Sequence, residues 1–473
     1  MFDMHDDSGK TPNRGNKPES EQKKEFDRYR KMMKEMGVLN FDSDMMDDMV
    51  DFYIDHENFE EALEVLQFIL DTIPTNSFAW MKKGNVLSSL NQWEEALICY
   101  NTAIQFNPAD SEIYLNKGIC LDFIGSYEEA LEMFNQAKTF DSLNPDIYFN
   151  IGITYEKMEN WQLAIENFQY CYAIDPSHKE CGFELAFCYD MLGESKKSIE
   201  YYKRQIDAEP YNYNAWYNLG IAYNRINNFD DAIQAFDLAI AIQSNFGPAL
   251  FNKANTLAKM GKYFQAIELY TEYLELEPDD TAAKQNIGNA YLETEKYEMA
   301  ISYLKEVVAV EKENAEAHYS LGCAYDGMER FIEALQSFKL AVKYESSNSE
   351  FVYAVADTLY NLGKLDDSIS LYRLVVSLDP NNHLAWYDYA ETAWELGLIE
   401  ESIKAISEAV ELNPQEYDYH IMAAQIFFAA EQHLNAWKHL KQAMIIDPVR
   451  LRQVIEKLTG LMSDDSVKDF LKS

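Results

Sequence analysis

Residues 215–240 read AWYNLGIAYNRINNFDDAIQAFDLAI, a mixture of small, aromatic and acidic residues that returns in the same order through the chain. Starting from Gly220 and stepping by 34 residues in both directions, every step from Gly84 to Ala424 lands on Gly or Ala. A second series through Ala232 holds only Ala or Ser, again with no insertion. An unbroken period of this length is the sequence signature of a repeat architecture.

Larger residues keep the same register. Four residues after each member of the second series stands a bulky side chain, such as Phe236, Tyr270 or Leu304. Twelve residues after each member, proline occurs at eight of the twelve steps. Because proline cannot continue a helix and its fixed φ suits a helix start, it marks the junction between successive helices.

The small and large positions predict two antiparallel helices in every 34 residues. Tyr217, Gly220 and Tyr223 share one helical face, and Ala232 and Phe236 share another. A small residue lets a neighbouring helix approach closely, and a large side chain opposite fills the remaining space. One helix pair cannot bury its apolar face alone, so the pairs must stack into an array.

The pattern W-x-x-L-G-x-x-Y, A-x-x-x-F and P resembles the tetratricopeptide repeat. Twelve such repeats fit residues 43–450, and the first is degenerate because Val50 replaces its small residue. The resemblance implies an all-α, right-handed superhelical solenoid of about twelve helix-turn-helix repeats. It also implies a concave groove, lined by the first helix of each pair, that binds proteins or peptides.

Three segments flank this array. Residues 1–20 are polar and are predicted to be a disordered tail. Residues 21–42 carry Phe26, Tyr29, Met33 and Met36 at helical spacing with basic residues between them, which predicts a basic amphipathic helix. Residues 451–473 are predicted to form capping helices, because the end of a solenoid needs a polar cover.

Composition excludes several classes of partner. The chain has 80 acidic and 40 basic side chains, for a formal net charge of −40, which argues against nucleic acid and anionic membranes. It contains no run of 18 apolar residues and no signal-like start, so we expect a cytoplasmic protein without membrane insertion. The six cysteines form no C-x-x-C pair, which favours reduced, packed thiols.

No pattern of residues predicts catalysis. The histidines form no H-E-x-x-H motif, and His433 and His439, six residues apart, lie on different sides of a helix. Neither of the common phosphate-binding glycine motifs occurs. Paired carboxylates such as Asp230 and Asp231 begin second helices, where negative charge favours the helix dipole. We therefore predict no enzyme activity, no metal and no cofactor.

An asparagine row is the first candidate for a peptide-binding groove. Two residues before the small residue of five repeats stand Asn116, Asn150, Asn218, Asn252 and Asn286. This row is similar to the asparagine ladder in the repeat arm of O-linked N-acetylglucosamine transferases. A side-chain amide both donates and accepts, so it can hold a peptide backbone without reading its sequence. Other residues break the row, namely Lys82, Glu184, Ser320, Ala354, Asp388 and Met422. The alternative is that asparagine is simply common at this repeat position.

Charged and amide side chains near the row are the second candidate. The acidic members are Glu112, Asp122, Asp146, Glu156, Glu180, Glu184 and Asp190, and the further amides include Asn255 and Asn289. An acidic strip would attract a basic segment in a salt-dependent way. The alternative is a solvated acidic surface without a ligand.

Two hypotheses of function follow. The favoured one is a non-catalytic scaffold or adaptor that binds an extended, basic partner segment in the groove. The alternative is a self-associating or autoinhibited regulatory subunit whose basic N-terminal helix occupies the acidic groove of its own or another chain. The sequence does not identify the partner, the pathway or the oligomeric state.

Overall fold

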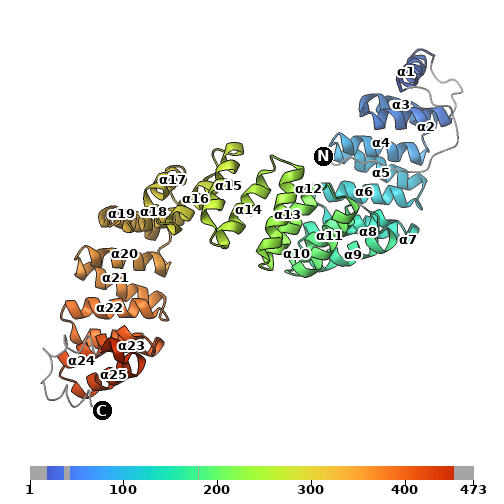
Figure 1. Cartoon of the computed structure of the whole chain (residues 1–473). Helices are drawn as coiled ribbons and strands as arrows, with labels where there is room; N and C mark the ends of the chain where they lie inside the picture. The colour runs from blue at the N-terminus through green and yellow to red at the C-terminus, as the bar shows by residue number, and fades with distance from the viewer. Residues whose placement is uncertain (1–18, 37–42, 179, 452–473) are drawn as a thin grey trace. The chain divides into compact units, whose positions relative to one another are not determined.

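The structure is a computed structural model that describes residues 19–36, 43–178 and 180–451. These residues form 25 α-helices and no strand (Figure 1). The all-α solenoid of helix pairs predicted from the sequence is therefore confirmed. The chain divides into two compact units, unit 1 (residues 1–226) and unit 2 (residues 227–473), and each is described by itself.

Unit 1 contains the N-terminal helix and the helices of the first repeats. Its helices are α1 (Glu19–Met36), α2 (Ser43–Asp55), α3 (Phe59–Thr72), α4 (Ser77–Ser89), α5 (Trp93–Phe106), α6 (Ser111–Phe123), α7 (Tyr127–Phe140), α8 (Pro145–Lys157), α9 (Trp161–Ile174), α10 (Cys181–Met191), α11 (Ser195–Ala208) and α12 (Tyr213–Arg225). From α2 onward even numbers are first helices and odd numbers are second helices. Each first helix from α4 on contacts the second helix before it, and first helices α4, α6, α8 and α10 also touch one another in sequence.

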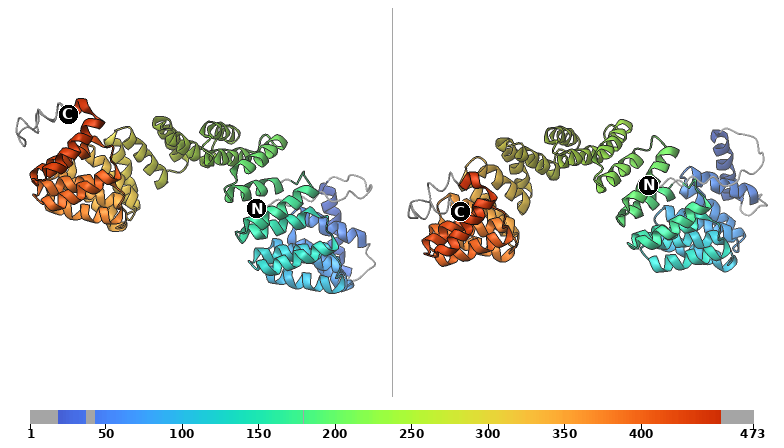
Figure 2. Two further views of the ribbon diagram at one scale, coloured as in Figure 1. Left: turned by 90° about the horizontal axis from the view of Figure 1, so that it is seen from below. Right: turned by 60° about the horizontal axis from the view of Figure 1, so that its bottom comes forward.

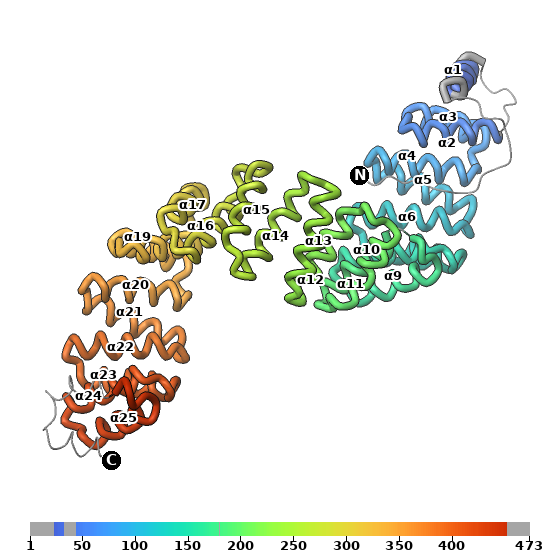
Figure 3. Tube along the Cα trace, viewed as in Figure 1, coloured from blue at the N-terminus to red at the C-terminus, as the bar shows by residue number. Residues whose placement is uncertain are grey.

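Unit 2 continues the same alternation. Its helices are α13 (Phe229–Ile242), α14 (Gly247–Lys259), α15 (Tyr263–Leu276), α16 (Thr281–Glu293), α17 (Tyr297–Val310), α18 (Ala315–Asp326), α19 (Phe331–Tyr344), α20 (Ser349–Asn361), α21 (Leu365–Leu378), α22 (His383–Glu395), α23 (Ile399–Leu412), α24 (Tyr417–Ala429) and α25 (His433–Ile446). Successive pairs such as α20/α21 and α22/α23 stack side by side, as both views of Figure 2 and the trace in Figure 3 show. First helices again touch, for example α16 with α18 and α20 with α22.

The small residue of each first helix makes room for the bulky residue of its second helix. A methyl group added at Gly118 would lie 2.5 Å from the Phe134 ring, and one added at Gly322 would lie equally close to the Phe338 ring. The matching position opposite Gly288 is filled by Leu304. The predicted close packing of small against large residues is confirmed.

The proline junction is stabilised by a hydrogen bond across successive repeats. The indole Nε1 of Trp216 donates to the carbonyl oxygen of Pro210 at 3.0 Å, and Trp386 donates to Pro380 at 2.9 Å. Asparagines then cap the next helix, since the side chain of Asn212 accepts from the backbone N–H of Ala215. The spacing of tryptophan and proline in the sequence therefore reflects a contact that joins repeats.

The turn between the two helices of a repeat uses a left-handed residue. Gly125 has φ of 81°, and glycine fills this position in five repeats, whereas glutamate or asparagine fills it in seven. Because only glycine adopts this conformation without a steric penalty, the seven other positions carry some backbone strain. Their geometry follows the repeat period although their residue types do not.

The basic helix predicted at residues 21–42 corresponds to α1, which begins at Glu19, within the segment predicted to be a disordered tail. The Phe26 ring packs edge-on against Phe52 at 5.2 Å, and Arg30 pairs with Glu61 at 3.1 Å. These contacts place α1 beside α2 and α3. This placement differs from the hypothesis that the helix occupies the acidic face of its own chain; occupation of another chain stays a prediction.

Some predictions fall on residues that are not described. The tail before residue 19 and the capping helices after Leu451 lie outside the described residues, as do the side chains of Met33 and Met36. All six cysteines are described, and none forms a disulfide; five are buried and Cys323 is half-buried. No helix among the described residues is long and apolar enough to cross a membrane.

Candidate functional site

The candidate site is the first-helix face, formed in each unit by the sides of the even-numbered helices that do not pack on second helices. All the asparagines and all but one of the carboxylates predicted from the sequence lie on these helices, and Glu180 immediately precedes α10. Because many first helices of neighbouring repeats touch, side chains one repeat apart can interact directly there. The interactions differ between the two units.

In unit 1 the asparagines of the predicted row are Asn116, Asn150 and Asn218, all half-buried. The Asn150 amide donates to the carbonyl oxygen of Asp146, one turn earlier in α8, at 2.8 Å. This bond fixes the side chain along its own helix and leaves the amide oxygen as the remaining acceptor. Nothing in the structure links these three amides to one another, so a continuous ladder stays a prediction.

In unit 2 two asparagines of neighbouring repeats are bonded to each other. Asn286 in α16 donates to the side-chain oxygen of Asn255 in α14 at 3.1 Å. The same oxygen accepts the hydroxyl of Tyr270, the bulky residue of that repeat. Asn252 donates to the carbonyl oxygen of Pro248 at 3.1 Å. Asn255 therefore contributes to packing between repeats as well as to the face.

Asn289 is a predicted amide whose hydrogen bonding is incomplete. It occupies in α16 the position that Asn255 occupies in α14, but its second helix offers Leu304 where Tyr270 offers a hydroxyl. Its Oδ1 atom is buried and has no hydrogen-bond partner among the described residues. A buried acceptor left unpaired typically destabilises by about 1–3 kcal/mol. This atom is a candidate contact for a partner.

Two of the predicted acidic residues of unit 1, Asp122 and Asp190, are paired with other side chains of the chain. The carboxylate of Asp122 accepts from the Thr154 hydroxyl at 2.8 Å and pairs with the ammonium of Lys157. That of Asp190 accepts from Ser198 at 2.7 Å and lies 3.4 Å from the Arg225 guanidinium. Both aspartates are only 7% exposed. The expectation that they line the wall as available negative charges is therefore wrong, because the next repeat supplies their cations.

Two further carboxylates surround a histidine. Asp146 lies 3.4 Å from Nε2 of His178, and Glu180 lies 4.0 Å from its Nδ1. Burial lowers the pKa of His178, but the hydrogen bond to Asp146 and the neighbouring negative charges outweigh burial and raise the pKa overall. The charges of Asp146 and Glu180 are thus partly compensated as the pH falls. Glu112 is exposed on α6.

Glu156 in α8 and Glu184 in α10 are two further carboxyls on first helices of successive repeats. Burial raises the pKa of Glu156, and it raises that of Glu184 as well. Burial, followed by the charge of Glu156 and the bond to it, raises the pKa of Glu184 well above the usual carboxyl range. The pair therefore carries less negative charge than the sequence indicates.

Sequence reasoning missed a set of carboxylates in unit 2, which we term the carboxylate row: Asp326 in α18, Asp357 in α20 and Asp388 in α22. All three are half-buried, and none forms an ion pair with a described Lys, Arg or His. Burial raises the pKa of each carboxyl. Neighbouring carboxylates raise the pKa of Asp357 and Asp388 further, and that of Asp388 reaches about 6. The row is therefore a line of poorly compensated acids.

The signal for this row was its spacing. Its members are 31 residues apart, which is one repeat less three residues, or about one helical turn back per repeat. In the sequence, Asp388 was noted only as an interruption of the asparagine row. A search at the 34-residue period alone does not align the three residues.

Tyrosines surround the carboxylate row. Tyr353 of α20 donates its hydroxyl to Asp388, and Tyr360 donates to Glu395 at 2.8 Å. The Tyr387 ring in α22 stacks on Tyr419 in α24, with ring centres 4.8 Å apart. The first-helix face of unit 2 is thus both acidic and aromatic.

A histidine pair lies at the end of unit 2. Nδ1 of His420 and Nδ1 of His439 are 3.0 Å apart, and Nε2 of His420 lies 3.0 Å from the carbonyl oxygen of Pro414. Since a carbonyl only accepts, His420 must donate from Nε2 and accept from His439 through Nδ1. Burial, then His420 and Lys438, lowers the pKa of His439 to about 4. The described residues contain no group of three or more side chains suited to a metal ion.

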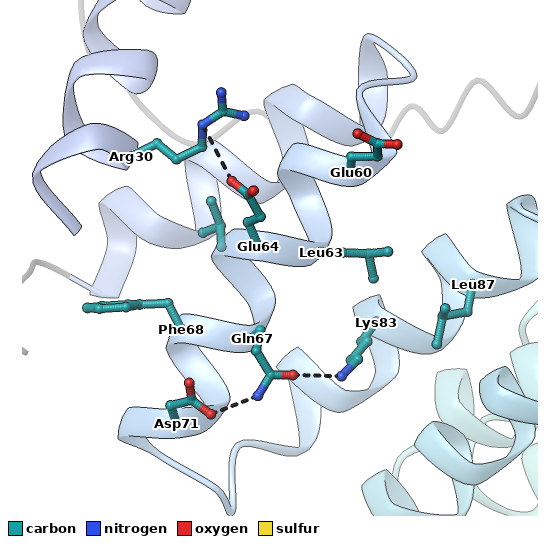
Figure 4. A pocket seen from close by; sticks show the side chains of 10 residues that line it. Arg30, Glu60, Leu63, Glu64, Gln67, Phe68, Asp71, Lys83 and Leu87 are labelled. Carbon is teal, nitrogen blue, oxygen red and sulfur yellow. Dashed lines mark hydrogen bonds and ion pairs between the residues drawn. The ribbon is translucent and has the colours of Figure 1, made fainter. Parts of the chain in front are cut away.

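A pocket of about 560 Å³ lies among α1, α3 and α4 of unit 1 (Figure 4). Its polar groups bond to one another: Gln67 donates to Asp71 at 2.7 Å and accepts from Lys83 at 2.9 Å, and Arg30 lies 3.7 Å from Glu64. The apolar part includes Leu63 and Phe68. Nothing in this arrangement resembles a nucleophile with its base.

Comparison with known proteins agrees with this architecture. Profiles of the tetratricopeptide repeat match residues 84–120, 124–159, 145–178, 213–246, 257–325, 319–383 and 353–417, which together make up more than half of the chain. The chain is a multi-repeat protein of the tetratricopeptide family, whose repeats mediate protein–protein interactions. No curated protein sequence matches it significantly.

A search of solved structures finds similar chains. The crystal structure of YrrB, described as a TPR protein with an unusual peptide-binding site, is 24% identical; the match covers 40% of this chain and 97% of that chain, with a TM-score of 0.36. Yeast Tom70 is 14% identical over 84% of this chain and 99% of its own, with a TM-score of 0.38. MamA from Desulfovibrio magneticus RS-1 is 20% identical over 36% and 95%, with a TM-score of 0.35.

Proposed function

We propose that this protein is a non-catalytic scaffold or adaptor that binds an extended segment of a partner protein on its first-helix face. The observation that carries the proposal is the buried, unpaired amide oxygen of Asn289. It lies on the same helix as Asn286. The side chain is half-buried, so a turn of its amide group toward solvent would let an incoming backbone N–H satisfy this acceptor and remove the penalty of leaving it unpaired.

The neighbouring amides support the same mode of binding. Asn286 donates one N–H to Asn255, and its side chain has further hydrogen-bonding capacity for a peptide group. Asn252 lies one repeat before it on α14. Side chains that offer both donors and acceptors can hold an extended backbone, while their neighbours determine which side chains the partner carries.

The test compares two triple variants of the full chain in affinity capture from lysate of the parent cell. One variant carries Asn252→Ala, Asn286→Ala and Asn289→Ala on the first-helix face. The matched control replaces exposed asparagines of second helices, namely Asn101, Asn135 and Asn435. Far-ultraviolet circular dichroism and thermal melting establish that both variants remain folded.

We expect a partner that the wild-type chain and the control variant capture equally and that the first-helix variant captures much less. Equal capture by all three chains would exclude the asparagines as the binding site. The site would then lie on second helices or at the chain ends.

A further inference from the structure

The carboxylate row of unit 2 lacks the cations that Asp122 and Asp190 of unit 1 receive. Asp122 and Asp190 each accept a hydroxyl and face a cation from the following repeat. Asp326 has neither, and its Oδ1 atom is buried without any hydrogen-bond partner among the described residues. A half-buried carboxylate without a cation is poorly compensated, so a ligand that supplies a cation at the exposed part of the side chain would gain free energy.

The residue type found 35 positions after each aspartate explains why Asp326 has no cation. The cations of unit 1 stand 35 residues after their acids, in Lys157 after Asp122 and Arg225 after Asp190. The residue 35 positions after Asp326 is Asn361, which donates to Asp357 at 3.3 Å instead. Asp388 receives a hydroxyl from Tyr353 but no cation. The row therefore has no cation of its own among the described residues at any of three successive first helices.

The spacing of the row selects the shape of the partner. Packed helices lie about 8–10 Å apart, and an extended chain advances about 3.3 Å per residue, so three residues span one helix step. A cation at every third residue of an extended segment would thus meet Asp326, Asp357 and Asp388 in turn. A helical partner would place successive cations differently, because it advances only about 1.5 Å per residue.

The tyrosines favour arginine over lysine at these places. The rings of Tyr353 and Tyr387 lie on α20 and α22, the helices that carry Asp357 and Asp388. A guanidinium group can bond a carboxylate through two N–H groups and stack on an aromatic ring at the same time. An ammonium group offers a point charge without the planar fork.

We propose that the first-helix face formed by α18, α20 and α22 binds an extended partner segment with a basic residue, preferably arginine, at every third position. This inference rests on the proposed function and assigns the partner chemistry for one part of the face. The sequence predicted that a basic segment binds near acids of unit 1. We now assign its binding to the carboxylate row of unit 2, whose acids have no cation of their own among the described residues.

The experiment measures binding of labelled heptapeptides to the full chain by fluorescence anisotropy at several salt concentrations. The first peptide has the sequence Arg-Ala-Ala-Arg-Ala-Ala-Arg. The second carries three adjacent arginines followed by four alanines, and the third replaces every arginine of the first with glutamine. The second peptide has the same charge as the first but not its spacing.

The protein variants separate local from long-range electrostatics. The row variant carries Asp326→Asn, Asp357→Asn and Asp388→Asn, which keeps side-chain shape. The matched control carries Asp367→Asn, Glu408→Gln and Glu411→Gln on exposed sides of second helices in the same unit. Both variants lose three negative charges, so any effect of net charge alone is equal.

We expect the spaced arginine peptide to bind most tightly, the row variant to lose about tenfold or more in affinity, and the control variant to change by about twofold or less. Equal losses in the two variants, or equal binding of the spaced and adjacent peptides, would overturn the proposal. Self-association of the chain that depends on the row, seen as a change in mass between the row variant and wild type, would also overturn it.

The two proposals can fail separately. If the Asn252, Asn286 and Asn289 variant loses its captured partner while no arginine peptide prefers the row, only the basic specificity is wrong. If that variant keeps its partner, the scaffold proposal fails at its own site. Should the triple row variant unfold, Asp388→Asn alone provides the same comparison with Glu408→Gln.

Discussion

The first-helix faces of units 1 and 2 have the same backbone register but differ in whether equivalent aspartates are paired with a cation. Lys157 and Arg225 of unit 1 stand 35 residues after Asp122 and Asp190, whereas the residue 35 positions after Asp326 of unit 2 is Asn361. Asp122 and Asp190 are therefore neutralised by their own chain, and Asp326 is not. The fold requires only the small and bulky residues at helix contacts, so the charges on this face are free to serve binding.

The largest expected effect comes from breaking the ion pair between Asp122 and Lys157 in unit 1. Lys157→Met leaves the buried Asp122 without its cation, and we expect unit 1 to lose about 2–4 kcal/mol, since stranding a buried charge is strongly destabilising. Asp326→Asn in unit 2 removes an uncompensated charge and should leave stability unchanged or higher. Native-state hydrogen exchange of α6 to α8 and of α18 to α20 measures the two effects. Equal destabilisation would mean that the two faces do not differ as described.

Overpacking should affect both units alike, because their packing is the same. Gly118→Leu and Gly322→Leu each force a side chain into space held by a phenylalanine ring, and we expect each to destabilise by about 1–3 kcal/mol. Replacing the exposed Lys296 with alanine should do little. Chemical denaturation followed by circular dichroism tests this. A large difference between the two glycine variants would show that the units do not share one packing scheme.

Acidification should act in opposite directions on two histidines. His439 in unit 2 has its pKa lowered from 6.5 to about 4, so the unfolded state binds more protons between these values and stability falls as the pH drops through that window. After allowance for partial exposure we expect a loss of about 1–2 kcal/mol. His178 in unit 1 has a raised pKa, so its stabilisation is present at low pH and is lost as the pH rises through the folded value.

Hydrogen exchange at pH 5 and pH 7, corrected for the intrinsic rates, measures both histidine effects in one sample. We expect protection near α24 and α25 to fall at pH 5, and protection near residues 175–183 to hold or rise. His439→Leu should remove the pH dependence of the former. Loss of protection in both regions at pH 5 would contradict the assigned environments.

The smallest expected effect comes from a substitution that gives Asp326 of unit 2 a cation like that of Asp122 in unit 1. Asn361→Lys places a cation 35 residues after Asp326, as Lys157 stands after Asp122. We expect a stabilisation of about 1 kcal/mol or less, because the new pair is only partly buried, together with weaker binding of the spaced arginine peptide. Asn361→Gln is the neutral control. Unchanged peptide binding in Asn361→Lys would mean that Asp326 does not contact the peptide.

The fold followed from the sequence because its determinants are regular. Gly220, Ala232 and Phe236 recur at one period, and each is fixed by a packing contact that recurs with it. The site was only partly predictable, since its interactions join residues at other spacings. The Asp122 pair with Lys157 and the Asp326 to Asp357 spacing depend on how helix faces meet, which a search at the repeat period does not show.

The chain ends illustrate the same limit. Amphipathic spacing indicated the helix that contains Phe26, but not the surface on which it packs. That surface includes Phe52 and Tyr53, residues of a repeat whose pattern is degenerate at Val50. Likewise His433 is the histidine nearest to His439 in the sequence before it, whereas the fold brings His420 to His439 from the preceding helix.

The most direct test of the contrast between the two faces is hydrogen-exchange mass spectrometry of the full chain with and without the spaced arginine heptapeptide at saturation. We predict slower exchange in α18, α20 and α22 and no change in α6, α8 and α10. Protection of α6 to α10 with no change in α18 to α22 would contradict the account, because it would place the cation-binding face on carboxylates that their own chain already neutralises.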